Sequence, residues 1–183
     1  ICDYRTDGAE PALELFHRGR SCLLINPGSD NGRRLFENFI VNNFGKYLRG
    51  QPRLMQRKDQ AYTDQSTALI SIASNASIAT FADATGTNPD SRRFRINIII
   101  DTNKAFAEAD MIGKTFHCGH ALLSVQKPVG RCAAINVDPE TANRHDHDYV
   151  RFMKAEFGHS NLGVFAKVIK GGEVKVGDVL RPT

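Results

Sequence analysis

At 183 residues, with 41% hydrophobic and 24% charged residues, the chain has the size and composition of one ordinary globular domain, which excludes an intrinsically disordered protein. The richest apolar run, residues 96–100, is far shorter than the ~20 residues that cross a membrane, so no membrane span is expected. A formal net charge of +4 is weak evidence for a polyanionic partner and suits a small phosphorylated ligand at least as well.

The cysteines are few and widely spaced, at positions 2, 22, 118 and 132. A disulfide-stabilised scaffold would carry a higher density of cysteines, and a structural zinc site would show paired ligands. We therefore expect reduced thiols in a reducing compartment, and a cytoplasmic protein. Residues 1–5 show no secretory signal pattern, and the lack of an initiator Met predicts a trimmed or fragmentary chain.

In the first half of the chain, turn residues separate short apolar runs from two helices. Residues 22–25 form an apolar run that stops at the turn sequence Asn-Pro-Gly-Ser, which predicts a strand. Residues 32–48 carry apolar side chains at spacings of three, four and one, which predicts an amphipathic helix. Residues 68–72 are short and apolar, and residues 74–85 form a second predicted helix that ends at Gly86.

The second half contains several short strands and one helix. Strands are predicted, from apolar runs between Gly and Pro signals, at residues 94–101, 115–118, 122–126 and 133–137. Residues 146–157 predict a helix with Asp146 as its N-cap. Residues 162–170 and 173–176 predict a β-hairpin, because the two glycines between them can supply the positive φ that a two-residue turn needs.

This series of elements favours a mostly β, α+β fold in which a few helices lie at the margin of a closed or partly closed β-barrel. We expect one domain over residues 1–183. The pattern shows no regular strand–helix–strand alternation and no glycine-rich turn between a strand and a helix. A dinucleotide-binding fold is therefore not expected.

The strand predicted at residues 94–101 carries a row of polar side chains. Because strand residues alternate between faces, Arg93, Arg95 and Asn97 share one face, and the opposite face is apolar. One interpretation is a half-buried strand with a solvated outer face. The other is a cavity that receives an anion, with arginine favoured for its planar, bidentate guanidinium.

A second candidate anion site lies at residues 71–75, where an apolar run leads into a helix. Ser71, Ser74 and Asn75 are residue types that cap free backbone amides at a helix start. The same amides, aligned with the helix dipole, can instead hold a phosphate. Capping alone and phosphate binding both remain open.

Cys132 directly follows Arg131, after a strand that ends in a Pro/Gly turn. A thiol beside cationic groups tends toward the reactive thiolate, which makes Cys132 a candidate nucleophile or metal ligand. The alternative is a buried, inert cysteine at the start of a strand.

Two pairs of histidines raise the alternative of a metal site. His117 and Cys118 point to opposite faces of a strand and cannot bind one metal without a bulge. His145 and His147 can share a face, but they precede a helix that Asp146 is expected to cap. A dedicated zinc or iron site is therefore not expected.

Seven segments in order resemble the MOSC domain family, named for the C-terminal part of molybdenum cofactor sulfurases. They are residues 68–74, 93–98, 106–114, 127–132, 137–141, 162–166 and 171–178. The resemblance is strongest from about residue 65 to residue 180, nearly two thirds of the chain. Each segment alone is short, but the shared order of all seven is specific.

The resemblance implies a MOSC-type β-barrel that binds the molybdenum cofactor, a pterin dithiolene that carries a phosphate. It implies that Cys132 ligates molybdenum or carries a persulfide. The residues expected around the pterin and its phosphate are Ser71, Arg93, Arg95, Asn97 and Arg131. The implied activity is sulfur transfer, or reduction of N-hydroxylated compounds as in the mitochondrial amidoxime-reducing component. A sulfur donor or redox protein is the implied partner.

Four residues depart from the family's pattern: Ile96 stands for Pro, Met111 for Trp, Ala142 for Gly and His120 for Asp. The aminotransferase-like half of full sulfurases, which binds pyridoxal phosphate, needs several hundred residues. Pyridoxal phosphate is therefore associated with this chain only at the family level and is not expected to bind it.

The alternative function is a non-catalytic β-barrel module that binds RNA or another polyanion through the same arginines. Aromatic residues make up 8% of the chain and lie mostly at apolar-face positions, which leaves few exposed platforms for base stacking. Specific nucleic-acid binding is therefore not expected.

Overall fold

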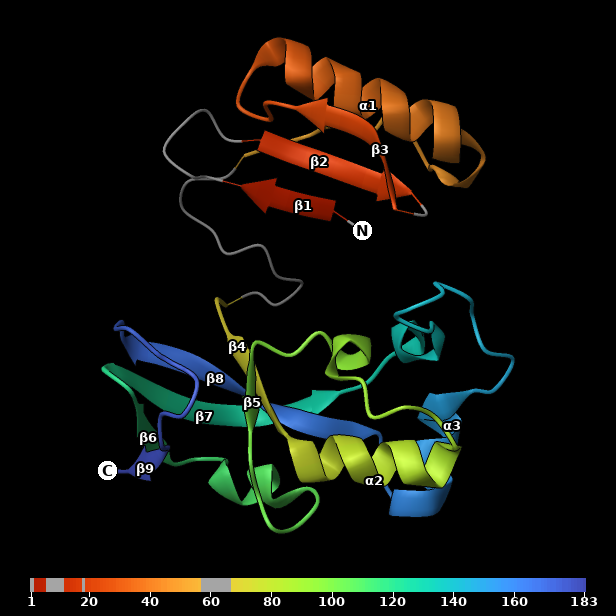
Figure 1. Ribbon diagram of the computed structural model, residues 1–183. Helices are drawn as coiled ribbons and strands as arrows, with labels where there is room; N and C mark the ends of the chain where they lie inside the picture. The colour runs from red at the N-terminus through yellow and green to blue at the C-terminus, as the bar shows by residue number, and fades with distance from the viewer. Residues whose placement is uncertain (1, 6–11, 18, 57–66) are drawn as a thin grey trace. The chain divides into compact units, whose positions relative to one another are not determined.

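The computed structural model describes residues 2–5, 12–17, 19–56 and 67–183, and the chain divides into two units, Ile1–Gln60 and Ala61–Thr183 (Figure 1). All seven segments that carry the family resemblance lie in the second unit. The expectation of one domain over residues 1–183 stays a prediction, because two units can be parts of one domain. Among the described residues, no helix is both long enough and apolar enough to cross a membrane.

The first unit is a three-stranded antiparallel sheet followed by a helix. Its elements are β1 (Cys2–Arg5), β2 (Ala12–His17), β3 (Arg20–Ile25), α1 (Asp30–Phe44) and the 3₁₀ helix η1 (Gly45–Tyr47). The strand order is β1-β2-β3, and α1 contacts β3. The strand predicted at residues 22–25 and the helix predicted at residues 32–48 are confirmed, the latter with a 3₁₀ end. Ser29 caps α1 by accepting a hydrogen bond from the Gly32 N–H at 3.0 Å.

The second unit is built on a curled, six-stranded sheet (Figure 1). Its strands are β4 (Ile70–Ser74), β5 (Ile98–Ile100), β6 (Thr115–Cys118), β7 (Ala121–Gly130), β8 (Asn161–Lys170) and β9 (Arg181–Pro182). They lie in the order β5-β4-β8-β7-β6-β9, with β4 and β5 parallel and the other pairs antiparallel. The predicted α+β fold class, with a partly closed barrel and few helices, is confirmed.

The helical elements of this unit connect the strands. They are α2 (Asn75–Thr85), α3 (Tyr149–Phe157) and the 3₁₀ helices η2 (Ser91–Phe94), η3 (Ala107–Met111) and η4 (Ala133–Asn136). Ser74 and Gly86 cap α2 as predicted, and the φ of Gly86 is +66°. The cap of α3 is Asp148 rather than Asp146, because the Asp148 carboxylate accepts from the N–H groups of the first helical turn.

Two apolar clusters form the core of the second unit. One lies on the inner side of the sheet and is made of residues from β4, β6, β7 and β8. The other joins α2 and α3 to the sheet, and in it Phe81 contacts Phe94 and Tyr149 edge to face. The second cluster fixes η2, which contains Phe94, against the helices.

Three predicted strands are wrong in part or whole. Of residues 94–101, only β5 is a strand, because Arg95 takes a left-handed φ of +51° and ends the extended run. Of residues 133–137, Ala133–Asn136 form the 3₁₀ helix η4 instead. The Arg93 guanidinium donates a hydrogen bond to Ile135 O in this turn. Within the described chain, residues 173–176 form no strand; Gly171 and Gly172 do not adopt positive φ, and β8 pairs with β4 and β7.

The connection from β4 through α2 to β5 is a strand–helix–strand crossover with parallel strands. The sequence was expected to contain no such rhythm. The pattern is hidden because the irregular residues 86–97 separate α2 from a strand of three residues. The crossover places the start of β4 beside residues 95–97, and this contact shapes the candidate site.

Candidate functional site

Cys132 lies where the chain leaves the sheet, between the end of β7 and the start of η4. The residue is exposed, and its thiol has no hydrogen-bond partner among the residues that the structure describes. Its backbone is held on both sides: the N–H of Arg131 donates to Ser160 O at 2.8 Å, and Cys132 O accepts from Ile135 N–H at 3.2 Å. An accessible thiol on a fixed backbone is suited to bind a soft metal or to attack an electrophilic sulfur.

Arg131 turns away from solvent and ties three segments together. Its Nε and Nη2 both donate to Leu162 O, and its Nη1 donates to Phe94 O at 2.9 Å. The guanidinium also lies 5.4 Å from the centre of the Phe94 ring. Burial lowers the pKa of Arg131 to about 10, an effect that nearby Cys132 and Glu108 partly oppose. The guanidinium thus stays charged at neutral pH, and its visible role is to join β7, β8 and η2.

Gly163 makes the Arg131 contact possible. Its φ of +88° turns β8 so that the preceding carbonyl, Leu162 O, faces the guanidinium. A Cβ at this position would lie 2.6 Å from Ile72 O and 3.3 Å from Arg131 Nη2. Only glycine fits both this φ and this space.

Glu108 is the most deeply buried charged residue in the described part of this unit, with 1% of its surface exposed. Its Oε1 accepts from Gly163 N–H at 3.2 Å, and its Oε2 accepts from Ser77 Oγ–H at 2.9 Å. Ser77 Oγ also accepts from Phe106 N–H and pairs with Ser74 Oγ. Because Ser77 gives its proton to Glu108, Ser74 is the donor in the serine pair. These hydrogen bonds connect η3 and α2 to Gly163 in β8. Gly163 follows Leu162, whose carbonyl oxygen accepts from Arg131.

The sequence predicted Arg93 on the polar face of a strand, but the residue is buried in the 3₁₀ helix η2. Its Nη1 donates to Ile135 O at 2.9 Å and to Val137 O at 3.1 Å, and its Nη2 lies 3.5 Å from the Asp138 carboxylate. The N–H groups of Thr141 and Glu140, with Arg93 nearby, lower the pKa of Asp138. Arg93 therefore fixes η4, the turn that begins at Cys132.

Arg95, two residues further on, differs from Arg93 in its exposure and in its side-chain contacts. It is exposed, and its side chain has no ion-pair or hydrogen-bond partner in the described part of the chain. Its backbone is anchored, because Phe94 O accepts from Arg131. The predicted common face of Arg93 and Arg95 does not exist; of the two, Arg95 is the guanidinium available to an anion.

Ser71 and Asn97 bind one another, which the sequence did not predict. Asn97 Oδ1 accepts from both the N–H and the Oγ–H of Ser71 at 2.9 Å, and Asn97 N–H donates to Ser71 Oγ at 3.1 Å. Their roles in cofactor binding remain predictions. The pair fixes residues 95–97 against β4, and Ser74, not Ser71, caps α2.

The structure therefore brings together most of the predicted site residues through the backbone around Phe94. Arg131 joins this segment to Cys132, and the Ser71–Asn97 pair joins it to β4. Glu108 and Gly163 were not predicted as site residues, although both lie in segments that carry the family resemblance. For Gly163 the signal was a lone glycine inside a predicted strand. Glu108 had no distinguishing signal, because Asp110 lies two residues further along the same segment.

The other described thiols differ from Cys132. Burial, and then the charge of Asp178, raise the pKa of the Cys118 thiol, which is 2% exposed and belongs to the core. Cys22 is exposed and donates to Leu15 O. Cys2 lies in β1, outside the residues whose side chains are described. No group of three or more His, Cys, Asp or Glu residues within the described ranges is arranged to hold a metal ion.

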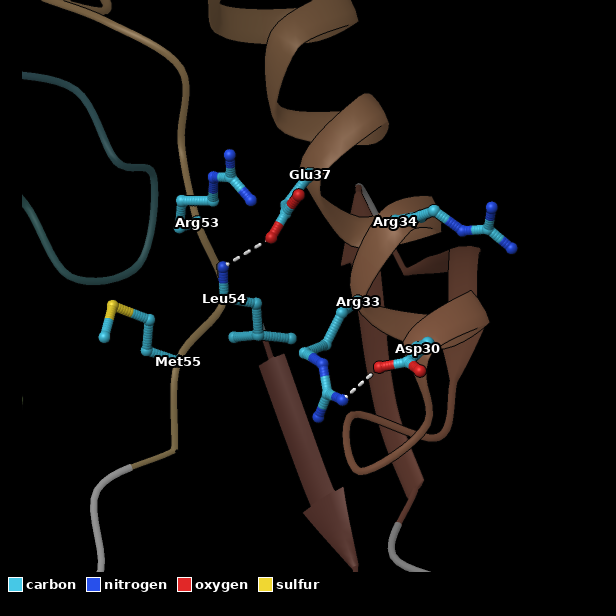
Figure 2. Close-up of a pocket in the computed structure, with 7 residues that line it drawn as sticks. All are labelled: Asp30, Arg33, Arg34, Glu37, Arg53, Leu54 and Met55. Carbon is cyan, nitrogen blue, oxygen red and sulfur yellow. Dashed lines mark hydrogen bonds and ion pairs between the residues drawn. The ribbon is translucent and has the colours of Figure 1, made fainter.

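Two open pockets do not have Cys132 in their lining. The first, of about 660 Å³, is in the first unit between α1 and residues 53–55 (Figure 2). Its charges are partly paired: Arg33 binds Asp30, and Glu37 accepts from Leu54 N–H at 2.9 Å. The second, of about 360 Å³, lies in the second unit where the β6–β7 turn meets the C-terminal segment. The predicted site residues line neither pocket.

Comparisons with known proteins identify a family for this chain. The family model described as the MOSC domain matches residues 58–181. A molybdenum cofactor sulfurase from Drosophila ananassae is 28% identical over 145 residues, which cover 75% of this chain and 18% of that protein. The chain thus spans less than a fifth of the curated relative that it matches.

Two solved structures are also similar. YiiM from Escherichia coli matches with 19% identity and a TM-score of 0.47, over 62% of this chain and 53% of that one. A structure described as that of a hypothetical protein matches with 18% identity and a TM-score of 0.49, over 65% of this chain and 54% of that one.

Proposed function

This chain belongs to the MOSC domain family, and on that basis we propose that its second unit binds the molybdenum cofactor through Cys132. The observation that carries the proposal is the exposed thiol of Cys132, placed at the end of β7 and held between Arg131 and η4. A cysteine thiolate is a preferred ligand of soft metals and the usual carrier of transferable sulfur.

The residues around Cys132 fit an anionic cofactor with a metal centre. Arg95 offers an unpaired guanidinium, the side chain best shaped to bind a phosphate by two hydrogen bonds. The Ser71–Asn97 pair holds the segment that presents it. When bound, the cofactor supplies a redox-active metal. Arg131 and Arg93 then serve as positioning residues. Arg131, the neighbour of Cys132, binds Leu162 O and Phe94 O, and Arg93 binds Ile135 O in η4, the turn that follows Cys132.

In sulfur transfer, the reacting group of this chain is the Cys132 thiolate. It attacks the outer sulfur of a persulfide on a donor protein, and the donor sulfur leaves as a thiolate, so that Cys132 becomes the persulfide. The step needs no external oxidant, because one sulfur–sulfur bond forms as another breaks. The match to a molybdenum cofactor sulfurase supports this role, and a donor that carries a persulfide is the proposed partner.

Replacing Cys132 with serine tests the proposed function. The parent, purified from a host that makes the cofactor, should contain molybdenum and pterin, and incubation with a persulfide donor should add about 32 Da to it. The Cys132→Ser variant should fold like the parent, because the side chain is exposed and the change is nearly isosteric. It should lose the added sulfur or most of the metal, since a hydroxyl is a poor ligand for a soft metal. Pterin binding should weaken but persist.

Cys22→Ser is the matched control, because Cys22 is the other exposed thiol with a described side chain. It should behave like the parent in metal content, added mass and pterin fluorescence. Equal molybdenum and equal sulfur uptake in the parent and in Cys132→Ser would contradict the proposed function.

Arg95→Ala should weaken binding of the cofactor by about ten- to a hundredfold, the effect of losing one charge-assisted hydrogen bond to a phosphate. The free energy of unfolding should change by less than ~0.5 kcal/mol, because the side chain is exposed and unpaired. Cofactor affinity can be measured by fluorescence titration with isolated cofactor, and stability by urea unfolding. Arg151→Ala removes an exposed charge from α3 and should change neither value. Unchanged affinity in Arg95→Ala would exclude this residue from the site.

A further inference from the structure

The second-unit pocket of about 360 Å³ lies at the far end of β7 from Cys132. His120, which lines the pocket, directly precedes β7, whereas Cys132 lies just after the end of β7. Since a strand rises about 3.3 Å per residue, the ten residues of β7 separate the two places by roughly 30 Å. Whatever binds in this pocket does not touch the Cys132 site.

The walls of the pocket are fixed by close backbone contacts. His120 N–H donates to Glu173 O at 3.0 Å. A Cβ on Gly119, whose φ is +54°, would lie 2.5 Å from Glu173 O, and a Cβ on Gly172 would lie 2.5 Å from His120 O. Two glycines thus let the C-terminal segment lie directly against the β6–β7 turn. The pocket is therefore formed before any ligand arrives.

The carboxylates that line this pocket already have partners within their own loop. Asp178 Oδ2 accepts from Lys175 N–H at 2.7 Å, and Glu173 forms an ion pair with the Lys175 ammonium at 3.2 Å. They therefore compete little for further cations. Lys175 is correspondingly neutralised by Glu173.

The remaining ionisable side chains of the lining are cationic or can become so. His117 in β6 is directly opposite Arg181 in β9, so both project from the outer face of the sheet with Cβ atoms about 5 Å apart. His120 adds a second imidazole from the turn. In the described chain, the side chains of His117, His120 and Arg181 have no hydrogen-bond or ion-pair partner.

We propose that this pocket binds a tetrahedral oxyanion, a sulfate or a phosphate group, with Arg181 as the permanent cation and with His117 and His120 as donors that strengthen binding when protonated. The charged groups that face the two imidazoles are Arg181 from β9 and Lys175, Glu173 and Asp178 from the adjoining loop. These four sum to no net charge at neutral pH. With both histidines protonated, the pocket has a charge of +2. Anion affinity should therefore rise as the pH falls.

Sulfate is the better probe, because its own charge stays −2 at both pH values of the experiment. The full-length chain, labelled with ¹⁵N, is titrated with sulfate at about pH 6 and about pH 8, at constant ionic strength, and amide shifts are followed by NMR. We expect shifts centred on Gly119, His120 and Arg181, and affinity about tenfold higher at the lower pH. A second titration with phosphate, at the lower pH, establishes whether the pocket accepts both anions.

Arg181→Gln should weaken sulfate binding about tenfold at both pH values, since one charged donor is lost. The double variant His117→Gln, His120→Gln should bind sulfate equally at the two pH values. Arg151→Gln, which removes an exposed cation from α3, is the matched control and should bind like the parent. If Arg181→Gln does not fold, Arg181→Lys keeps the charge and should retain part of the affinity.

Three results would overturn the proposal: unchanged sulfate affinity in Arg181→Gln, pH dependence that persists in the double histidine variant, or an equal loss in Arg151→Gln. The last would show that sulfate is attracted only by the overall charge of the chain. Cys132 variants should leave sulfate binding unchanged, so this test is independent of the proposed cofactor function.

Discussion

Gly163→Ala is expected to lower the free energy of unfolding by about 2–6 kcal/mol. The φ of +88° costs an alanine about 1–3 kcal/mol, and forcing a methyl group into a filled space costs a further ~1–3 kcal/mol. The new Cβ would lie 2.6 Å from Ile72 O, and the nearest side chains, Ala73 and Arg131, would have to move. Typical domains unfold at a cost of ~5–15 kcal/mol, so the change is a large part of the total. Urea unfolding followed by circular dichroism measures it.

Gly158→Ala separates the two contributions. Gly158 has a similar φ of +76°, but no described atom outside its own chain neighbours lies within 4 Å of a Cβ placed there. It should therefore lose only the backbone contribution, about 1 kcal/mol. Equal losses in the two variants would mean that β4 moves away at little cost and that the close approach of β4 and β8 does not require glycine.

Glu108→Ala is expected to cost about 3–5 kcal/mol, because it leaves two buried donors, Gly163 N–H and Ser77 Oγ–H, without their acceptor and opens a cavity. Glu108→Gln should cost less, about 1–2 kcal/mol, because the amide oxygen can still accept and the serine hydroxyls can reverse. Both are measured by urea unfolding.

Glu156→Ala is the control, since Glu156 is an exposed carboxylate on α3; its effect should stay within ~0.5 kcal/mol. A Glu108→Ala variant as stable as the parent would show that water satisfies the two donors. A larger loss in Glu108→Ala than in Glu108→Gln would show that the packing and hydrogen bonds of this side chain stabilise the fold more than its charge does.

The sequence was sufficient for elements whose signals are local. The α2 helix was predicted to within one residue because Ser74 and Gly86 supply both of its caps. The strand signal at residues 94–101 misled, because the apolar alternation continues through Arg95 although its backbone turns left-handed there. That turn depends on contacts with β4 and Arg131, which are distant in sequence and carry no local pattern.

In the candidate site, too, local features were predictable from the sequence and features that depend on distant contacts were not. The position of Cys132 after a turn was predictable from its neighbours, whereas its exposure was left open between a reactive and a buried thiol. The roles of its arginines were not, because an arginine that binds carbonyls and one that faces solvent look alike in sequence. Arg93 and Arg131 donate to carbonyls in other segments, whereas Arg95 does not. Glu108 carried no periodic signal at all; only the fold makes it central.

The segment that carries Cys132 leaves the sheet after β7 and returns as β8, the antiparallel neighbour of the strand it left. Within this excursion, residues 138–148 link η4 to α3 along the surface. The register of the two strands is set by their own pairing and does not depend on the length of that link. Insertions and substitutions there can change what approaches the thiol while the sheet stays the same. In evolutionary terms, the surroundings of Cys132 can diverge without a new fold having to arise.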